Sequence, residues 1–316
     1  MRIHIISTIN GAENEGMRNI AAHMSREFAR MHTVRHSGLR QPLSILRHSL
    51  FSDASLIFAR ANSRTYLLAR ALELLHRRVF LICVQPPERA FAVRCRRRPL
   101  RCPCFALDES DLDALPAMRV RRFRIGIDGQ KFSPATADMQ RRLKQKYGFP
   151  ADRPLVVHVG HCSSGRGLED FLVLDAARCE RLVVASGLFE NAYTAARLAA
   201  GGLRIQRGFL RNVEEIYQMA DVYLFPTRSA EHSISIPLSA MEALSCGTPV
   251  VGYESFRGLK YIPAAPGAIT LVHDAAALNG ALDAAIQKKT GRTLLTDAPT
   301  WREAAAELLR MIQEEI

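Results

Sequence analysis

The sequence lacks any apolar run long enough to cross a bilayer. A membrane-spanning helix needs about 20 consecutive apolar residues, and no stretch of the 316 residues approaches that length. The opening segment, "MRIHIISTIN", is typical of a buried strand, and it is too short and too polar beyond Thr8 for a signal peptide. We therefore expect a cytoplasmic protein without a spanning segment.

The chain also lacks a cysteine framework. Seven cysteines is an odd number, and without a secretion signal they fit a reducing cytoplasm better than a set of disulfides. Cys102 and Cys104 could form half of a metal site, but no second cysteine pair or histidine pair lies nearby at zinc spacing. We expect no metal, and we expect residues 94–104 to form an irregular, mobile surface loop with ordinary thiols.

Lysine is absent from the first 127 residues. This part has 22 arginines and 10 acidic residues, an excess of +12, whereas residues 128–316 have 21 basic and 21 acidic residues. Two basic runs stand out, Arg94 to Arg101 and "RVRRFR" at 119–124. Such a patch attracts phosphates, anionic lipid head groups or nucleic acid, and the alternative is plain solvated surface arginine. We expect no nucleic acid partner, because no aromatic-rich or helix-turn-helix pattern accompanies the charge.

Strand and helix patterns alternate along the whole chain, which predicts an α/β protein with parallel sheets. The predicted strands are 2–7, 54–60, 79–85, 154–160, 181–186, 203–209, 221–227 and 248–253. The predicted helices are 17–31, 64–78, 167–177, one from Ala192, 212–220, 238–245 and a last one in 298–316, where Thr300 and Glu303 are spaced for a capping box.

The join between two α/β domains is predicted near "GIDGQKFSP" at 126–134, because a glycine-rich turn followed by Pro134 suits a linker. We therefore expect a short, strongly basic domain at 1–127 and a second domain at 128–298. Residues 299–316 are expected to form a terminal helix that can return to the first domain.

The stretch "VHVGHCSSGRG" at 157–167 predicts an anion site. A strand ends at Gly160, and a serine- and glycine-rich loop leads to a helix expected to start near Gly167. Ligands of parallel sheets lie outside the carboxyl ends of the strands, and amides at a helix start favour anions. His161 and Arg166 lie on this loop, so a diphosphate would find donors and positive charge there.

The stretch "LSAMEALSCGTPVV" offers a second element. A carboxylate accepts two hydrogen bonds from a diol well, so Glu242 could bind the hydroxyls of a ribose. The backbone of Ser235, Ile236 and Leu238, just before and at the start of this helix, would face the sugar or phosphate end. The alternative is a solvent-facing Glu242, but its small, apolar neighbours favour tight packing.

Several motifs resemble those of family 4 glycosyltransferases and occur in the same order. They are "NGAENEG", "GIDGQKFSP", "VVHVGHCSSGRGLEDFL", "RGFLRNVEEIYQMADVYLFPT", "PLSAMEALSCGTPVVGY" and "TWREAAAELL". The resemblance implies a GT-B fold, in which two Rossmann-like domains face each other across a cleft and the last helix returns to the first domain. It also implies sugar transfer from a nucleotide-sugar with retention at the anomeric carbon, without an essential metal or a cofactor.

The resemblance also implies roles for individual residues. His161 and Arg166 align with the pair that binds the donor diphosphate, and Glu242 aligns with the ribose carboxylate. The backbone near Leu210 and Arg211 aligns with the segment that holds the base.

In the first domain, Gly11 or Gly16 matches the glycine that lets this domain approach the donor. Gln85 stands where many members have a histidine near the reacting carbon. Ile234 replaces a second glutamate that often contacts the sugar, and Glu231 and His232 are close but out of register.

The sequence thus predicts a retaining glycosyltransferase that uses a UDP- or GDP-type sugar donor. Its expected place is the assembly of cell-surface polysaccharide, lipopolysaccharide or glycolipid, with an anionic or lipid-linked acceptor at the inner membrane face. Two alternatives remain open: a non-catalytic GT-B relative that binds an anionic surface or a partner, and a GT-B nucleotide-sugar epimerase. The sugar, the acceptor and the oligomeric state are left open.

Overall fold

The computed structural model describes residues 1–8, 16–75, 78–108, 115, 118–187 and 191–316. The chain divides into two compact units. Unit 1 contains Met1–Gly126, Ser233–Ile236 and Pro299–Ile316, and unit 2 contains Ile127–His232 and Pro237–Ala298. Each unit is built on a six-stranded sheet whose neighbouring strands all run parallel, which confirms the predicted α/β class.

The sheet of unit 1 has the strand order β2-β1-β3-β4-β5-β6. Its strands are β1 (Arg2–Ser7), β2 (Thr33–Gly38), β3 (Ala54–Phe58), β4 (Val79–Cys83), β5 (Cys104–Ala106) and β6 (Val120–Arg122). The central strands β3 and β4 are buried at every position, whereas the polar β2 is largely exposed along one edge. This difference explains why β2 has no apolar signal in the sequence.

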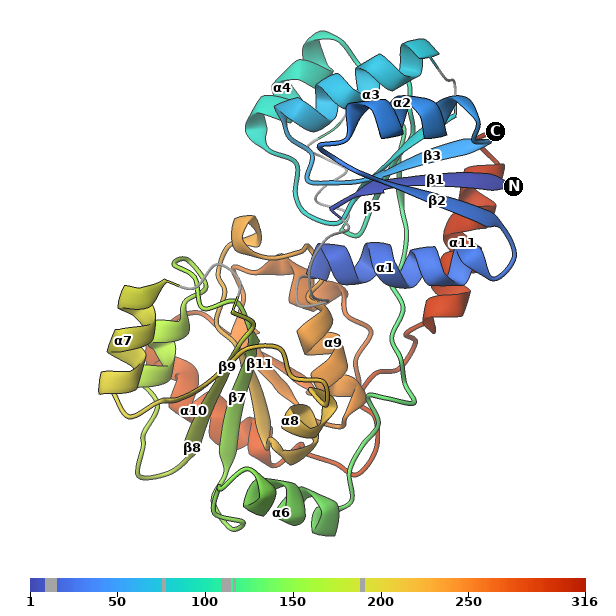
Figure 1. Ribbon diagram of the computed structural model, residues 1–316. Helices are drawn as coiled ribbons and strands as arrows, with labels where there is room; N and C mark the ends of the chain where they lie inside the picture. Colours follow the sequence, from blue (N-terminus) through green and yellow to red (C-terminus); the bar gives the residue numbers. More distant parts are fainter. Residues whose placement is uncertain (9–15, 76–77, 109–114, 116–117, 188–190) are drawn as a thin grey trace. The chain divides into compact units, whose positions relative to one another are not determined.

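Helices cover both faces of this sheet (Figure 1). Helices α2 (Pro42–Leu50), α3 (Ser63–Leu75) and α4 (Arg89–Arg97) lie on one face, and α1 (Gly16–Ala29) and α11 (Trp301–Gln313) lie on the other. From β1 the chain goes first to β2 on one side and then to β3 on the other. Because both directions use right-handed crossovers, α1 lies on the opposite face from the next three helices. Thr300 and Glu303 form the predicted capping box at the start of α11.

Helix α11 is attached to unit 1 by stacking and by ion pairs. The ring of Trp301 stacks on His23 of α1 at 4.4 Å between centroids. The basic run at 119–124 faces acidic residues on and just after α11: Arg119 pairs with Glu315 at 2.8 Å, and Arg124 pairs with Glu307 at 3.4 Å. Part of the arginine excess of the first domain is therefore neutralised inside the unit.

The prediction that residues 94–104 form an irregular loop with surface thiols was wrong. Arg94–Arg97 form the last turn of α4, and Cys104 begins β5. Cys95 and Cys102 are buried in the core of unit 1, and the Cys104 thiol lies 3.4 Å from the sulfur of Cys83. The arginines hid this pattern, because the apolar positions of α4 are few and lie one turn apart.

The sheet of unit 2 has the order β12-β11-β10-β7-β8-β9. The strands are β7 (Leu155–Gly160), β8 (Glu180–Ala185), β9 (Arg204–Arg207), β10 (Val222–Phe225), β11 (Val250–Tyr253) and β12 (Ile269–Val272). The helices are α6 (Ala137–Lys146), α7 (Ala192–Ala200), α8 (Glu214–Met219), α9 (Leu238–Ser245) and α10 (Leu278–Ile286). Four 3-10 segments join them, η1 (Leu168–Leu172), η2 (Ala230–His232), η3 (Arg257–Tyr261) and η4 (Ala275–Ala277).

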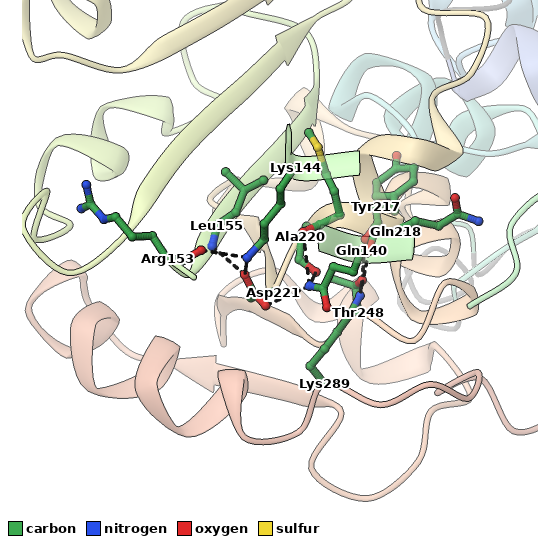
Figure 2. Close-up of polar contacts among 11 residues, drawn as sticks. Gln140, Lys144, Arg153, Leu155, Tyr217, Gln218, Ala220, Asp221, Thr248 and Lys289 are labelled. Atoms are coloured by element: carbon green, nitrogen blue, oxygen red, sulfur yellow. Dashed lines mark hydrogen bonds and ion pairs between the residues drawn. The ribbon is translucent and has the colours of Figure 1, made fainter. Parts of the chain in front are cut away.

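A buried ionic network closes the amino-terminal edge of this sheet (Figure 2). The carboxylate of Asp221, just before β10, accepts hydrogen bonds from Lys144 Nζ at 2.7 Å, the Leu155 amide at 2.8 Å and Gln140 Nε2 at 2.9 Å. Lys144 also donates to the carbonyl oxygen of Arg153 at 2.8 Å. One carboxylate thus ties α6 to the starts of two central strands.

Within the described ranges, no helix is both long enough and apolar enough to cross a membrane.

Candidate functional site

The strand order of unit 2 reverses between β7 and β10. The chain goes from β7 outward through β8 and β9, then returns to the other side of β7 with β10. At such a switch point the loops that follow the two strands diverge, and the carboxyl ends of the strands are where open α/β sheets bind ligands. The candidate site therefore lies at the ends of β7 and β10.

The loops that follow these two strands touch each other. The Thr227 hydroxyl donates to the carbonyl oxygen of Arg166 at 3.3 Å. Gly167 has a φ of 71°, and a Cβ atom there would lie 2.4 Å from the Pro226 carbonyl oxygen. A larger residue at 167 would therefore force the two loops apart.

The helix expected to start near Gly167 is a five-residue 3-10 helix, η1. The sequence predicted a helix over 167–177, but only Leu168–Leu172 are helical. So short an element offers no α-helical amino terminus to an anion. Any anion at this loop must be held by side chains and loop amides.

Arg166 is the cation of this loop, and it is buried. Its side chain is 9% exposed, and its Nε has no hydrogen-bond partner among the described residues. Burial holds the pKa of the guanidinium below its ordinary value, although the group stays protonated at neutral pH. A buried charge without a full set of partners is costly, so this geometry favours an anionic ligand.

A second buried arginine of unit 2 provides the contrast. Arg181 is equally 9% exposed, but its guanidinium donates to the carbonyl oxygens of Phe171 and Gly201, both at 3.0 Å. Arg181 holds chain segments together, whereas the Nε of Arg166 has no acceptor in the part of the chain that the structure describes.

A buried histidine supports the start of the loop. His158 is fully buried, its Nδ1 lies 3.0 Å from the Leu224 carbonyl oxygen, and its Nε2 lies 2.8 Å from where a Cβ of Gly160 would be. Only glycine therefore fits at 160. Burial, and then the charge of Arg166, lower the pKa of His158 to about 3, so the imidazole is neutral at physiological pH.

Two further histidines lie on or beside the loop. The Nδ1 atom of His161 is 2.7 Å from the Ser186 hydroxyl, which fixes the ring beside the end of β8. The His232 ring lies over Gly165, since a Cβ atom at 165 would come within 2.4 Å of its Nε2. The sequence motif had suggested His232 only as a residue out of register.

Glu242 lies on α9, and its carboxylate Oε2 accepts a hydrogen bond from the Tyr217 hydroxyl at 2.8 Å. Burial raises the pKa of Glu242 to about 7, against the lowering effects of Tyr217 and Lys131. The side chain keeps partial exposure, so it is neither a solvated surface residue nor sealed in the core.

Tyr223 connects α9 to the end of β7. Its hydroxyl donates to the Val159 carbonyl oxygen at 3.2 Å and lies 2.7 Å from the Ser239 hydroxyl, which can donate to it. Ser239 is one turn before Glu242 on the same helix. Glu242 and the loop with Arg166 are thus held on one scaffold within unit 2.

The site contains an ionic cluster that the sequence did not reveal. Arg228 follows β10 and forms two contacts with the buried carboxylate of Asp170, at 2.9 and 3.1 Å. The same carboxylate accepts a hydrogen bond from Tyr253 at 2.7 Å, and Arg228 stacks over the Tyr253 ring. This cluster fixes the loop after β10 against η1, and its members are 25 to 83 residues apart in sequence.

Three of the predicted site residues that the structure describes, Gln85, Ser235 and Ile236, lie in unit 1. Gln85 follows β4, and the adjacent Val84 carbonyl accepts the Ser235 amide at 2.8 Å, so that amide already has an acceptor. Ile234 lies against Gly16, where a Cβ atom would meet its Cδ1 at 2.9 Å. Gln85 and segment 233–236 therefore lie side by side in unit 1.

The remaining predicted residues are distributed as follows. Ile236 is buried in unit 1, and Leu238 is buried at the first position of α9. Leu210 lies in unit 2 after β9, where it is half-buried. Gly11 lies outside the described residues. The structure brings together Gly160, His161 and Arg166, with Glu242 on the scaffold beside them.

No group of three or more histidine, cysteine or carboxylate side chains in the described part of the chain is arranged to hold a metal ion. That the protein works without metal or cofactor stays a prediction.

Comparisons with known proteins agree with this architecture. Residues 172–288 match the family described as Glycosyl transferases group 1, and no curated protein matches the chain in sequence. The chain is similar to Alr3699/HepE of Anabaena, solved with UDP and glucose, with 12% identity and a TM-score of 0.79 over 98% of this chain and 99% of that one.

Two further solved structures are similar over nearly the whole chain. Sucrose-phosphate synthase of Thermosynechococcus elongatus is 15% identical, with a TM-score of 0.78 over 99% of this chain and 98% of that one. WaaG, a glycosyltransferase involved in lipopolysaccharide biosynthesis, is 15% identical, with a TM-score of 0.66 over 97% and 95%. At these identities the likeness shows the fold, which is the GT-B fold of two Rossmann-like units.

Proposed function

We propose that this chain, in which residues 172–288 match the group 1 glycosyl transferases, transfers a sugar from a nucleoside diphosphate to an acceptor. The observation that carries the proposal is Arg166, a buried guanidinium with an unpartnered Nε at the switch point of unit 2. UDP is the favoured nucleotide, since the similar HepE structures contain UDP or UDP-glucose.

In this proposal the diphosphate lies against the loop after β7. Negative charge grows on the diphosphate as the bond between the anomeric carbon and its oxygen breaks, and Arg166 stabilises that charge. His161 supplies a hydrogen bond from the same loop. Glu242 accepts hydrogen bonds from the two ribose hydroxyls, so its carboxylate gains two hydrogen-bond donors.

Retention at the anomeric carbon belongs to the same proposal. The acceptor oxygen attacks from the face that the diphosphate leaves, and the departing diphosphate oxygen takes the acceptor proton. Arg166 and His161 then act on the leaving group alone, so this course needs no metal and no second carboxylate at position 234. The acceptor is proposed to be an anionic or lipid-linked sugar of cell-surface polysaccharide, lipopolysaccharide or glycolipid assembly.

Nucleotide binding tests the role of Arg166. We expect UDP to bind the full chain, and Arg166→Ala to weaken that binding by about tenfold or more, because a charge-assisted hydrogen bond is lost. Arg181→Met removes an equally buried arginine whose partners are carbonyls, so it should lower the melting temperature and leave the affinity for UDP unchanged. Calorimetric titration with UDP and GDP measures both.

The same proteins test turnover. Incubation with a panel of UDP-sugars should release UDP slowly in wild type and more slowly in Arg166→Ala. Failure of wild type to bind any nucleotide contradicts the proposal. Tight binding of UDP without release from any sugar nucleotide supports the non-catalytic alternative instead.

A further inference from the structure

The outer face of helices α2, α3 and α4 in unit 1 carries an unusual number of exposed apolar side chains. Nine of the fifteen large apolar side chains exposed in the described chain come from this layer and its connections. They are Leu39, Leu43, Leu46, Leu50, Phe51, Leu67, Leu74, Leu75 and Val93. Leu43 and Leu74 are 82% and 81% exposed.

These side chains lie on one side of each helix. In α2, Leu43, Leu46 and Leu50 are spaced i, i+3 and i+7, opposite the buried Ile45 and Ser49. In α3, Leu67 and Leu74 are seven residues apart, which places them on the outward side as well. The three helices lie side by side on one face of the sheet (Figure 1), so their outward stripes form one surface.

The same surface carries arginines without acidic partners. Arg40, Arg47, Arg64, Arg89, Arg94, Arg96, Arg97 and Arg98 are exposed, and none forms an ion pair with a described residue. Helix α4 repeats the outward stripe with Arg89, Val93 and Arg96. Arginines and leucines therefore alternate across the layer.

The acidic residue of these three helices is turned away from this surface. Glu73 has a side chain that is 8% exposed, and its carboxylate accepts the amides of Arg101 and Cys102 at 2.6 and 2.8 Å and pairs with Arg70. The opposite layer of unit 1 differs, because its basic run at 119–124 meets the glutamates of α11. The α2–α4 surface thus carries eight exposed arginines that form no ion pair with a described residue.

We propose that the α2–α4 surface docks on an anionic lipid bilayer. The leucines and Phe51 enter the boundary between head groups and acyl chains, and the arginines bind lipid phosphates while their methylene stems follow the apolar surface. A second copy of this chain fits worse, because a symmetric contact would place arginine against arginine. The surface belongs to unit 1 alone, so the inference does not rest on the proposed sugar transfer.

Vesicle co-sedimentation of the full chain tests this. Vesicles of phosphatidylcholine mixed with phosphatidylglycerol should pellet the protein, those of phosphatidylcholine alone should not, and added salt should release it. Leu43→Ser combined with Leu50→Ser should weaken binding about tenfold or more, since two leucine side chains that enter the bilayer are lost. Tyr193→Ser, an exposed apolar residue of unit 2, is the matched control and should bind as wild type does.

Arginine variants test the charge separately. Arg96→Gln combined with Arg97→Gln should weaken binding about tenfold and reduce its dependence on salt. Arg141→Gln combined with Arg142→Gln on α6 changes the net charge equally and should leave binding unchanged. Equal binding to both vesicle types, or loss of binding in the unit 2 controls alone, overturns the proposal.

A direct probe of insertion is available because all seven native cysteines are buried. Leu43→Cys labelled with a polarity-sensitive fluorophore should shift to the blue on anionic vesicles, and labelled Tyr193→Cys should not. Self-association of wild type without any shift at position 43 would assign this surface to a second copy and reject the lipid.

Discussion

The two units share one sheet architecture but differ in the polar groups they bury. In unit 1 the buried polar cluster is built from histidine and serine: His4 lies 2.9 Å from the Ser37 hydroxyl and 3.1 Å from that of Ser49. In unit 2 the buried groups include charged ones: Lys144 pairs with Asp221, and the buried carboxylate of Asp170 pairs with the exposed Arg228.

Unit 2 buries the Lys144–Asp221 pair and the guanidinium of Arg166, where low polarity strengthens each electrostatic contact. Unit 1 carries exposed arginines without a described acidic partner on its α2–α4 surface. Under the two proposals above, unit 2 binds a small charged ligand and unit 1 meets a large charged surface.

The largest effect is expected from breaking the buried Lys144–Asp221 ion pair of unit 2. Asp221→Ala leaves Lys144 buried without its carboxylate and should lower the free energy of unfolding by about 3–5 kcal/mol. Adding Lys144→Met should recover much of this loss. Denaturant unfolding measures both. Arg119→Ala, which removes an exposed pair of unit 1, should have no resolvable effect, and a large one would contradict the comparison.

Histidine 158 links the stability of unit 2 to pH. Its folded pKa of about 3 lies below the ordinary value of 6.5, so the unfolded chain binds the proton more tightly. Stability is therefore complete above pH 6.5 and is lost as pH falls toward 3, by about 2 kcal/mol at pH 5. His158→Asn keeps a donor for the Leu224 carbonyl and should flatten this part of the pH profile in thermal unfolding. An unchanged profile would mean that folding does not lower the pKa of His158, and it would contradict the prediction.

Glu242 should act in the opposite direction. Its folded pKa of about 7 lies above the ordinary 4.5, so its burial costs stability as pH rises from 4.5 to 7. Glu242→Gln should therefore stabilise the ligand-free protein at pH 8, on the order of 1–2 kcal/mol because the side chain is partly exposed. It should weaken UDP binding at the same pH.

The two effects of Glu242→Gln have separate measurements, thermal unfolding and calorimetric titration. Tyr217→Phe removes the donor to Glu242 and keeps the carboxylate, so it is the control that should retain UDP binding. A variant that loses stability and affinity together would show that Glu242 serves the fold alone.

The smallest expected effect concerns unit 1. Thr300→Ala removes the capping box of α11 and should cost about 1 kcal/mol in the unfolding of unit 1. Thr300→Ser keeps the hydroxyl and should restore the cap. Equal losses in both variants, measured by circular dichroism on heating, would show that the cap does not stabilise α11.

The sequence was sufficient for elements whose side chains reveal their surroundings. β3, β4, β7 and β10 are apolar runs because both faces of a parallel sheet are covered. The structure adds β2, with exposed polar residues at the sheet edge, and α6, a strongly polar helix that buries Leu143 and Lys144. Neither carries an apolar period, since tertiary contacts rather than local pattern define them.

The candidate site divides in the same way. Gly160, Arg166 and Glu242 could be proposed from the sequence because they lie at or after the end of a strand or on a short apolar helix. The carboxylate of Asp170 and its partners Arg228 and Tyr253 meet only after three strands have been placed in order. No local spacing could distinguish Arg166 from Arg181 either, because their difference is the set of acceptors each one reaches in the folded chain.

Trp301 gives the protein its own spectroscopic reporter. It is the single tryptophan of the sequence, it is 8% exposed, and its ring stacks on His23 where α11 meets α1. Its emission therefore comes from unit 1 alone and from a place where the last helix packs against the first. Release of the last helix would expose the indole to water and shift its emission to the red, so the detachment of thirteen residues can be followed without any label.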